Sequence, residues 1–145
     1  MVNVAQSVYI EPQWTAEQVL SAIANKESSD SAVVQHPDGV SFKKYGLTEM
    51  SVKDAHDSGK LPWCKHPKYM NDAEQLEAAL AYLSLMKERF SCLTWLDSAG
   101  YYHRSNDHQE GHADHGGHKC TCAADRREYV RAIRSRLERH YPPQG

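Results

Sequence analysis

The chain has 145 residues, of which 40% are hydrophobic and 25% are charged, and its formal net charge is −2. These values are typical of one globular domain with a hydrophobic core, and the charge does not favour nucleic acid as a partner. No run approaches the roughly 18 apolar residues of a membrane span, and the first residues lack a basic stretch followed by an apolar core. We therefore expect a soluble protein that is made in the cytoplasm without a signal peptide.

A first helix is expected after an irregular lead-in over residues 1–14. Thr15 and Gln18 have the spacing of a capping box, and apolar residues then recur at steps of four and three. Glu27 falls on this apolar stripe. A carboxyl group in such a position is either kept neutral or held where substrate can reach it, and a neutral one can act as a general acid. The alternative is that the helix frays after Lys26 and that Glu27 points into water.

Five helices are expected in all, separated by segments rich in turn-forming residues. In chain order they span residues 15–29, 47–58, 72–90, 92–99 and 123–140. Gly59 and Gly100 are expected to end the second and the fourth of these helices. A Pro-Asp-Gly turn at 37–39 leaves room for one small β-hairpin. The sequence thus predicts a mainly helical single domain over residues 1–145.

The last expected helix is rich in arginine. Its apolar face consists of Tyr129, Val130, Ile133 and Leu137. Around this face lie Arg126, Arg127, Arg131, Arg134, Arg136 and Arg139. A run of like charges on a helix is usually exposed to water, so we expect a solvated face here and not a specific anion site.

Residues 101–122 form an insertion rich in histidine and cysteine between the last two helices. Its candidate zinc ligands are His108, His112, His115, His118, Cys120 and Cys122, with His103 just before them. Imidazole and thiolate are zinc's preferred ligands, although the Cys-x-Cys spacing fits no named zinc finger. Gly, Asp and Asn around them favour a flexible loop without metal. Both a structural zinc site and a solvated loop stay open, and we do not expect a catalytic metal.

Five short stretches, each weak alone, follow one another in a distinctive order. They are Glu27-Ser28-Ser29, the segment YGLTEMSVKDA at 45–55, the segment NDAEQLEAALAYLSLMKERF at 71–90, LDSAG at 96–100 and Tyr129-Val130. In this order they resemble the soluble lytic transglycosylases, a lysozyme-like family that cleaves the glycan strands of peptidoglycan. The resemblance covers about residues 15–138. Thr48 and Glu49 stand where the family has Met-Gln, and Asp97 and Ser98 where it has Tyr-Asn.

The resemblance implies an α+β lysozyme-like fold with a catalytic groove. Glu27 would be the general acid and base at the β-1,4 bond between MurNAc and GlcNAc, and the muramic acid's own 6-hydroxyl would attack, without a cofactor. Tyrosine offers an apolar face to a sugar ring and a hydroxyl to its polar edge. The expected substrate-binding residues are Ser28, Ser29, Tyr45, Thr48, Glu49, Asp97, Tyr101 and Tyr129.

Two other functions stay open. A hydrolysing lysozyme would need a second carboxylate opposite Glu27. The candidates are Asp30, Asp38, Glu49, Asp54 and Asp97, of which Glu49 and Asp97 lie inside the matched motifs. The other alternative is a zinc-stapled binding module without enzymatic activity. The enzyme would be expected to act at the bacterial cell wall. It would reach the wall either in a phage virion, with other virion proteins as partners, or after release by a holin.

Overall fold

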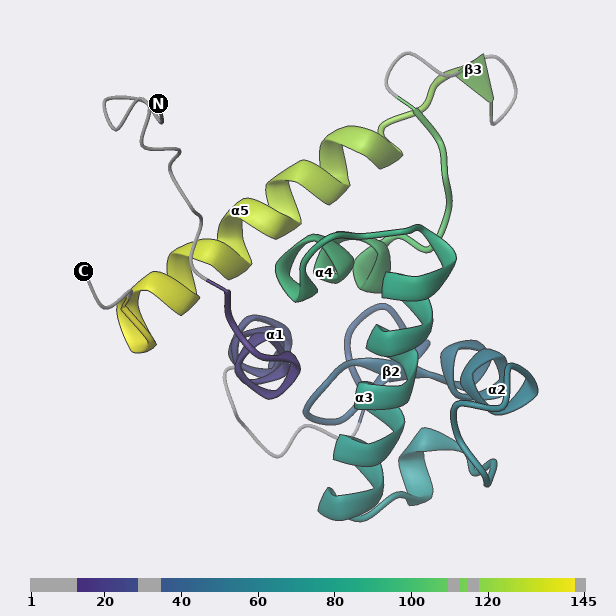
Figure 1. Ribbon diagram of the computed structural model, residues 1–145. Helices are drawn as coiled ribbons and strands as arrows, with labels where there is room; N and C mark the ends of the chain where they lie inside the picture. The colour runs from purple at the N-terminus through teal and green to yellow at the C-terminus, as the bar shows by residue number, and fades with distance from the viewer. Residues whose placement is uncertain (1–12, 29–34, 110–112, 115–117, 143–145) are drawn as a thin grey trace, which may run out of the picture.

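The computed structural model describes residues 13–28, 35–109, 113–114 and 118–142, and it is mainly helical (Figure 1). Its α-helices are α1 (Ala16–Ser28), α2 (Glu49–Asp57), α3 (Asp72–Arg89), α4 (Trp95–His103) and α5 (Cys122–His140), with a 3-10 turn η2 at Pro67–Tyr69. The strands form two short antiparallel pairs, β1 (Ser41–Phe42) with β2 (Leu47–Thr48) and β3 (Ala113–Asp114) with β4 (His118–Lys119). The mainly helical fold class predicted from the sequence is confirmed.

Helix α1 begins as its capping pattern predicts. The Thr15 backbone N–H donates to Gln18 Oε1 over 3.0 Å, and the Gln18 N–H donates to Thr15 Oγ1 over 3.1 Å. The helix then continues through Glu27 to Ser28, with Leu20 and Ile23 fully buried on its apolar face. The fraying after Lys26 that we considered therefore does not occur.

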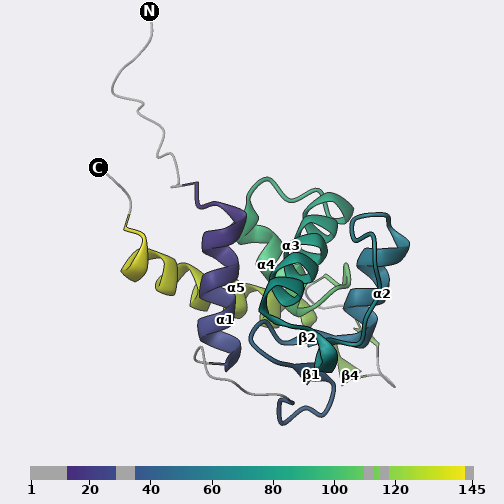
Figure 2. The same ribbon diagram turned by 90° about the horizontal axis from the view of Figure 1, so that it is seen from below.

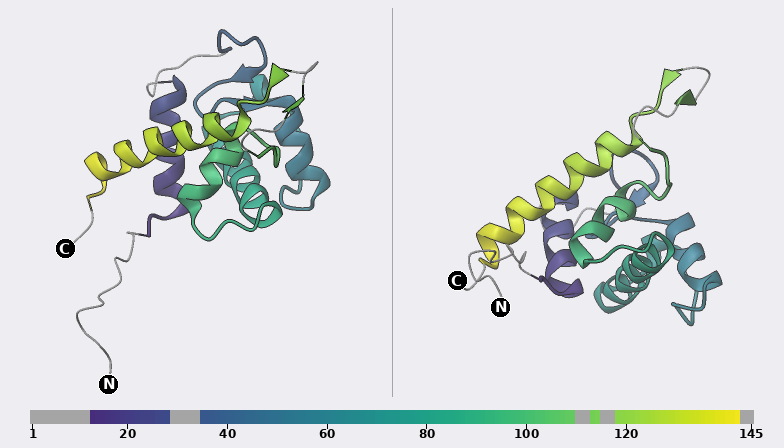
Figure 3. Two further views of the ribbon diagram at one scale, coloured as in Figure 1. Left: turned by 90° about the horizontal axis from the view of Figure 1, so that it is seen from above. Right: turned by 45° about the horizontal axis from the view of Figure 1, so that its top comes forward.

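The helices pack around one core, in which α3 lies between α1 and α2 (Figure 2). Helix α5 crosses α1 and runs beside α4 (Figure 3). Large side chains with no exposed surface, among them Leu83 and Met86 of α3 and Ile133 and Leu137 of α5, fill the space between them. This crossing of α1 and α5 brings together residues about a hundred positions apart. Among the described helices, none has both the length and the hydropathy that a membrane crossing requires.

Helix α4 differs from the prediction at both ends. It begins at Trp95, where Thr94 Oγ1 accepts a hydrogen bond from the Asp97 N–H over 3.0 Å, and it runs past Gly100 to His103. The expectation that Gly100 ends the helix is therefore wrong. A Cβ at Gly100 would lie 3.0 Å from Val130 Cγ2, so this glycine allows α4 and α5 to approach closely. The insertion consequently begins at Arg104 and not at Tyr101.

The Pro-Asp-Gly turn is also only part of the hairpin region. Asp38 Oδ1 accepts hydrogen bonds from the backbone N–H groups of Val40 and Ser41, and an isolated bridge pairs Gln35 with Phe42. The named strands pair one turn later in the chain, where Gly46 has a positive φ of 62°. The predicted hairpin is thus present, but its ladder closes around the 43–46 turn.

The solvated face expected for the arginines of α5 is wrong for Arg126. This side chain is only 7% exposed, and it donates hydrogen bonds to the backbone oxygens of Asn106 and His108. Arg136 is half-buried and donates from Nε to Asn25 Oδ1 over 2.9 Å. A guanidinium carries five N–H donors in a fixed fork, so Arg126 can hold the backbone of the insertion against α5.

Candidate functional site

Glu27 lies half-buried in the last turn of α1, where it meets the middle of α5. Tyr129, which is 3% exposed, donates a hydrogen bond from its hydroxyl to Glu27 Oε2 over 2.9 Å. Burial, followed by the negative charge of Glu27, raises the pKa of Tyr129 well above its ordinary value. The phenol therefore keeps its proton at neutral pH and remains a donor to the carboxylate.

The turn between β1 and β2 covers the other oxygen of Glu27. A Cβ built on Gly46 would lie 3.0 Å from Glu27 Oε1 and 3.5 Å from His36 Cε1. His36 Nε2 in turn lies 2.6 Å from the backbone oxygen of Lys43. The backbone at Gly46 can approach the carboxylate this closely because glycine has no side chain and tolerates a φ of +62°.

Two side chains cover the ring of Tyr129. The His103 ring stacks on it with centroids 4.3 Å apart and planes 4° apart, and Lys26 Nζ lies 5.4 Å from the ring centroid. Burial, with a smaller effect from the Arg104 charge, lowers the pKa of His103. His103 is therefore a neutral ring at neutral pH, and Lys26 is the positive group beside this pair. We call Glu27, Tyr129, Gly46, His103 and Lys26 the Glu27 site.

Helix α4 contributes a second tyrosine close to this site. Tyr102 donates from its hydroxyl to the backbone oxygen of Tyr45 over 2.8 Å. Burial and then the charge of Glu27 raise its pKa well above the ordinary value, so this phenol also keeps its proton. Tyr45 itself is 8% exposed, with Lys44 Nζ 5.8 Å from its ring centroid, and it packs in the core.

Ser28 and Thr48, two other residues of the matched motifs, make hydrogen bonds to the backbone. Ser28 is buried next to Glu27, and its hydroxyl donates to the backbone oxygens of Ala24 and Lys44. It thereby ties the end of α1 to the turn that covers Glu27. Thr48 caps α2 through its side chain, which accepts from the Ser51 N–H over 3.0 Å. Ser29 lies outside the described residues.

Glu49, Asp97 and Tyr101 line cavities that Glu27 does not line. Glu49 is exposed at the start of α2, 3.6 Å from His66 Nε2, beside a cavity of about 510 Å³. Asp97 and Tyr101 line a different cavity of about 730 Å³ between α4 and α5. The segment 29–34, which follows α1 directly and contains Asp30, lies outside the described residues.

The remaining two carboxylates are held by other groups. Asp38 accepts a hydrogen bond from the Ser41 hydroxyl over 2.5 Å, and this contact lowers its pKa. Asp54 lies 3.9 Å from Arg89 Nη1 on the side of the molecule formed by α2 and α3. Neither has a contact with Glu27.

Sequence reasoning missed Gly46, Tyr102, His103 and Lys26 as neighbours of the catalytic candidate. Gly46 stands inside the second motif, and its position just before a helix was the only signal available from the chain. The stack of His103 on Tyr129 has no sequence signal, because it depends on α4 continuing past Gly100.

A second cluster lies at the start of α5. The ligand atoms of His108, Cys120 and Cys122 lie within 4.8 Å of one another, with His108 Nδ1 3.3 Å from Cys120 Sγ. Both thiols are buried and the imidazole is half-buried. This group could hold a metal ion. His112 and His115, like the side chain of His118, lie outside the described residues, so their part in the predicted ligand set stays a prediction.

Two contacts orient the sulfur atoms of this cluster. The side chain of Asn106 donates to Cys122 Sγ over 3.4 Å, and the Cys122 backbone N–H donates to Cys120 Sγ over 3.4 Å. Asn106 also accepts from Arg126, so the cluster is connected to the buried arginine of α5. N–H donors aimed at sulfur stabilise thiolates, which are the ligand form of cysteine.

Comparison of the chain with protein-family models, with curated proteins and with solved structures gives no match.

Proposed function

We propose that this chain is a peptidoglycan-cleaving enzyme of the lytic transglycosylase type, with Glu27 as its general acid and base. One observation carries the proposal: Glu27 is a half-buried carboxyl group at a helix end, and Tyr129 donates a hydrogen bond to its Oε2 over 2.9 Å. These two residues belong to the first and the last of the motifs that resemble the family, and they meet across 102 positions of sequence.

The chemistry needs one proton that is given and then taken back. Protonated Glu27 would give its proton to the glycosidic oxygen between MurNAc and GlcNAc as the bond to the anomeric carbon breaks. The resulting carboxylate would then accept the proton of the muramic acid's 6-hydroxyl as that oxygen attacks the anomeric carbon. A 1,6-anhydro ring forms, Glu27 recovers its proton, and no water is consumed.

Tyr129 would act on the carboxylate stage of this cycle. A phenol that keeps its proton donates to the charged form of Glu27 through Oε2, while Oε1 faces the backbone at Gly46. Hydrogen bonds to an ionised acceptor are about twice as strong as neutral ones. The hydrogen bond thus supports the state in which Glu27 acts as the base.

The positions of Glu49 and Asp97 favour this mechanism over a hydrolysing lysozyme. A retaining or inverting pair needs two carboxyl groups about 5–10 Å apart across the bond. Glu49 and Asp97 line two separate cavities, and Glu27 lines neither. Hydrolysis with one of them remains the alternative, and the products distinguish it, because a hydrolase leaves a reducing end where a transglycosylase leaves an anhydro ring.

We further propose that His108, Cys120 and Cys122 bind a structural zinc ion. Two thiolates and an imidazole form a donor set that suits zinc, and the three ligand atoms are already close together. The ion would fix the insertion to the start of α5 through Asn106 and Arg126. Metal analysis of protein purified without a histidine tag tests this, and a zinc-to-protein ratio near zero contradicts it.

Zymography on purified peptidoglycan tests the enzymatic proposal. Glu27→Gln keeps the size of the side chain and removes its titrating proton, so clearing should fall by about 10²–10⁴-fold. Glu49→Gln and Asp97→Asn are the matched controls, and both should clear normally. Clearing that survives Glu27→Gln contradicts the mechanism, and wild-type protein that neither clears nor releases anhydro products favours the binding module instead. Mass spectrometry of the products identifies the anhydro ring.

A further inference from the structure

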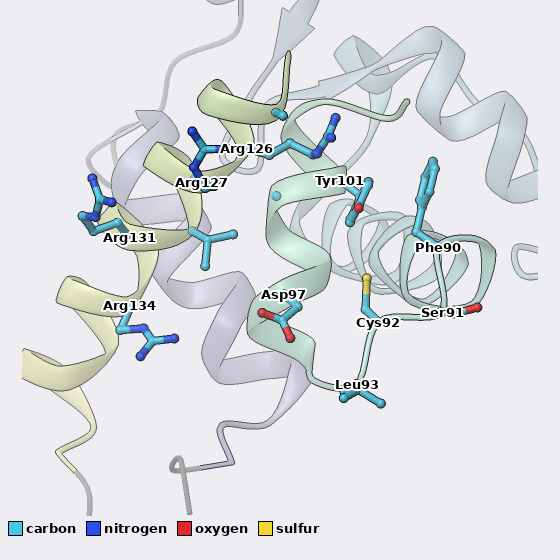
Figure 4. A pocket seen from close by; sticks show the side chains of 13 residues that line it. Phe90, Ser91, Cys92, Leu93, Asp97, Tyr101, Arg126, Arg127, Arg131 and Arg134 are labelled. Atoms are coloured by element: carbon cyan, nitrogen blue, oxygen red, sulfur yellow. The ribbon is translucent and has the colours of Figure 1, made fainter. Parts of the chain in front are cut away.

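A cavity away from Glu27 lies between α4, α5 and the turn that follows α3. It has a volume of about 730 Å³ and is open to solvent (Figure 4). Cavities that hold small ligands or a few residues of a peptide have volumes of this order. The cavity is therefore large enough for a bound segment, and its lining shows which chemistry that segment would have.

Positive charge dominates the lining. Four arginines contribute to it, Arg126, Arg127, Arg131 and Arg134, against one acidic side chain, Asp97. This excess is local, because the chain as a whole has a formal net charge of −2. A concave surface lined by one sign of charge concentrates ligands of the opposite sign.

Three of the four arginines, all on α5, are regularly spaced along the helix. Arg127, Arg131 and Arg134 are separated by four and three positions, which places them on one face of the helix. Their Cα atoms are therefore about 6 Å and about 4.5 Å apart along the helix axis. Alternate side chains of an extended peptide are about 6.8 Å apart, which long arginine side chains can match. An arginine guanidinium is able to bind a carboxylate through two parallel hydrogen bonds, and Arg131 is exposed.

The opposite wall is apolar. Phe90 stacks on Tyr101 with ring centroids 4.1 Å apart. The guanidinium carbon of Arg126 lies over the Tyr101 ring, 4.9 Å from its centroid. Leu93 is 89% exposed and stands at the edge of the cavity (Figure 4). An exposed leucine in the same lining as the stacked rings of Phe90 and Tyr101 is suited to contact apolar side chains. Inorganic phosphate or a bare phosphate chain would gain nothing from it.

We propose that this cavity binds an acidic segment of a partner protein in extended form, with carboxylates on the arginine side and apolar side chains on the Phe90 and Leu93 side. The alternation of an extended chain presents successive side chains to opposite walls, as these two linings require. The proposal is independent of the chemistry at Glu27, which does not line the cavity.

Fluorescence anisotropy with labelled peptides tests the proposal on the intact chain. A peptide that alternates Glu and Leu should bind, and its Gln-Leu counterpart should bind at least about tenfold more weakly, because each charge-assisted hydrogen bond lost is worth about a factor of ten. A Glu-Ser peptide should also bind more weakly. Equal binding of the Glu-Leu and Gln-Leu peptides, or displacement by tripolyphosphate at the same concentration as by Glu-Leu peptide, overturns the proposal.

Variants of exposed residues assign the binding to this cavity. Arg131 is exposed and pairs only loosely with Glu128 at 3.6 Å, so Arg131→Glu should fold normally and lower affinity for the Glu-Leu peptide by about tenfold or more. Arg139→Glu makes the same charge change on α5 outside the cavity lining and should leave affinity within about twofold. Similar losses in both variants would mean general charge attraction and would overturn the site.

Leu93→Ser tests the apolar wall in the same assay. Leu93 is exposed, so the fold should not change, while affinity for the Glu-Leu peptide should fall by about threefold to tenfold. Met50→Ser, at another exposed apolar residue, is the control. Glu27→Gln should bind the peptide as the wild type does, which separates this site from the proposed activity. Unchanged binding by Leu93→Ser contradicts the apolar wall.

Discussion

The Glu27 site and the His108, Cys120 and Cys122 cluster are built in opposite ways. Glu27 and Tyr129 come from helices at the two ends of the chain and meet because α1 and α5 cross in the core. The metal-ligand cluster comes from one stretch of 15 residues, 108–122, in which Cys120 and Cys122 flank Thr121. The first arrangement depends on the packing of the whole domain, whereas the second depends on local chain geometry.

Because of this difference, we expect the contacts of the two sites to be lost under different conditions. The hydrogen bond between Tyr129 and Glu27 lies next to fully buried residues such as Ile23 and Ile133, so it should persist for as long as the core is folded. In the described part of the insertion, Arg126 donates to the backbone oxygens of Asn106 and His108, and Arg104 pairs with Asp125 over 3.0 Å. A bound metal ion would therefore act mainly on the insertion and the start of α5, and hardly on Glu27.

Metal removal should produce the largest effect on stability. At a free zinc concentration about a thousand times its Kd, one bound ion stabilises the folded state by about 4 kcal/mol. We expect chelation, or the double substitution of Cys120→Ser with Cys122→Ser, to lower the free energy of unfolding by about that amount, measured by urea titration. Peptidoglycan clearing at low temperature should be retained. Loss of clearing in metal-free protein that is still folded would show that the two sites are coupled.

Tyr129→Phe should weaken the Glu27 site without affecting the metal cluster. A hydrogen bond to a charged acceptor contributes about 1.5–3 kcal/mol, so both the stability and the rate of clearing should fall, the latter by about tenfold or more. Zinc content should not change.

Tyr102→Phe is the matched control for this substitution. Tyr102 donates to a backbone oxygen and not to Glu27. The Tyr102→Phe variant should therefore lose about 1 kcal/mol of stability and keep its clearing activity. If both variants lose clearing equally, the hydrogen bond to Glu27 has no special role.

Much of the fold follows from local sequence signals. The capping pair of Thr15 and Gln18 and the alternating steps of apolar residues predict α1 correctly, because both effects act within one or two turns of helix. Gly100 misled the prediction for a physical reason. A glycine is favoured at a helix end for its backbone freedom, but also at a helix crossing for its lack of a side chain, and only the position of Val130 distinguishes the two.

The candidate sites were less accessible to sequence reasoning. Periodicity indicated that Glu27 would face the core, but the partner that satisfies it comes from a helix about a hundred residues later, and only a motif resemblance connected the two. The burial of Arg126 was missed because a run of arginines is usually solvated, and its acceptors are backbone oxygens that have no sequence signature.

Gly46→Ala should produce a smaller effect that belongs to the Glu27 site alone. The positive φ of 62° costs an alanine about 1–2 kcal/mol, and its Cβ would lie 3.0 Å from Glu27 Oε1. Gly39→Ala is the matched control, since Gly39 has a φ of 77° and no heavy atom within 4 Å of its Cβ position. Both variants should lose similar stability in urea, but only Gly46→Ala should clear peptidoglycan more slowly. Equal activity in the two would mean that Glu27 tolerates displacement.

A last effect, which is absent at neutral pH, should be seen at alkaline pH. Burial and the charge of Glu27 raise the pKa of Tyr129 in the folded state above its unfolded value of about 10. Below about pH 10 the phenol is protonated in both states, so the stability that its protonated form contributes is fully present. Above that pH the unfolded chain loses the proton first. The contribution is then lost as the pH rises towards the folded pKa. The free energy of unfolding of the wild type should therefore fall more steeply than that of Tyr129→Phe, by about 1.4 kcal/mol per pH unit. Parallel slopes in urea titrations between about pH 9 and 11 would mean that water reaches the Tyr129 hydroxyl in the folded state.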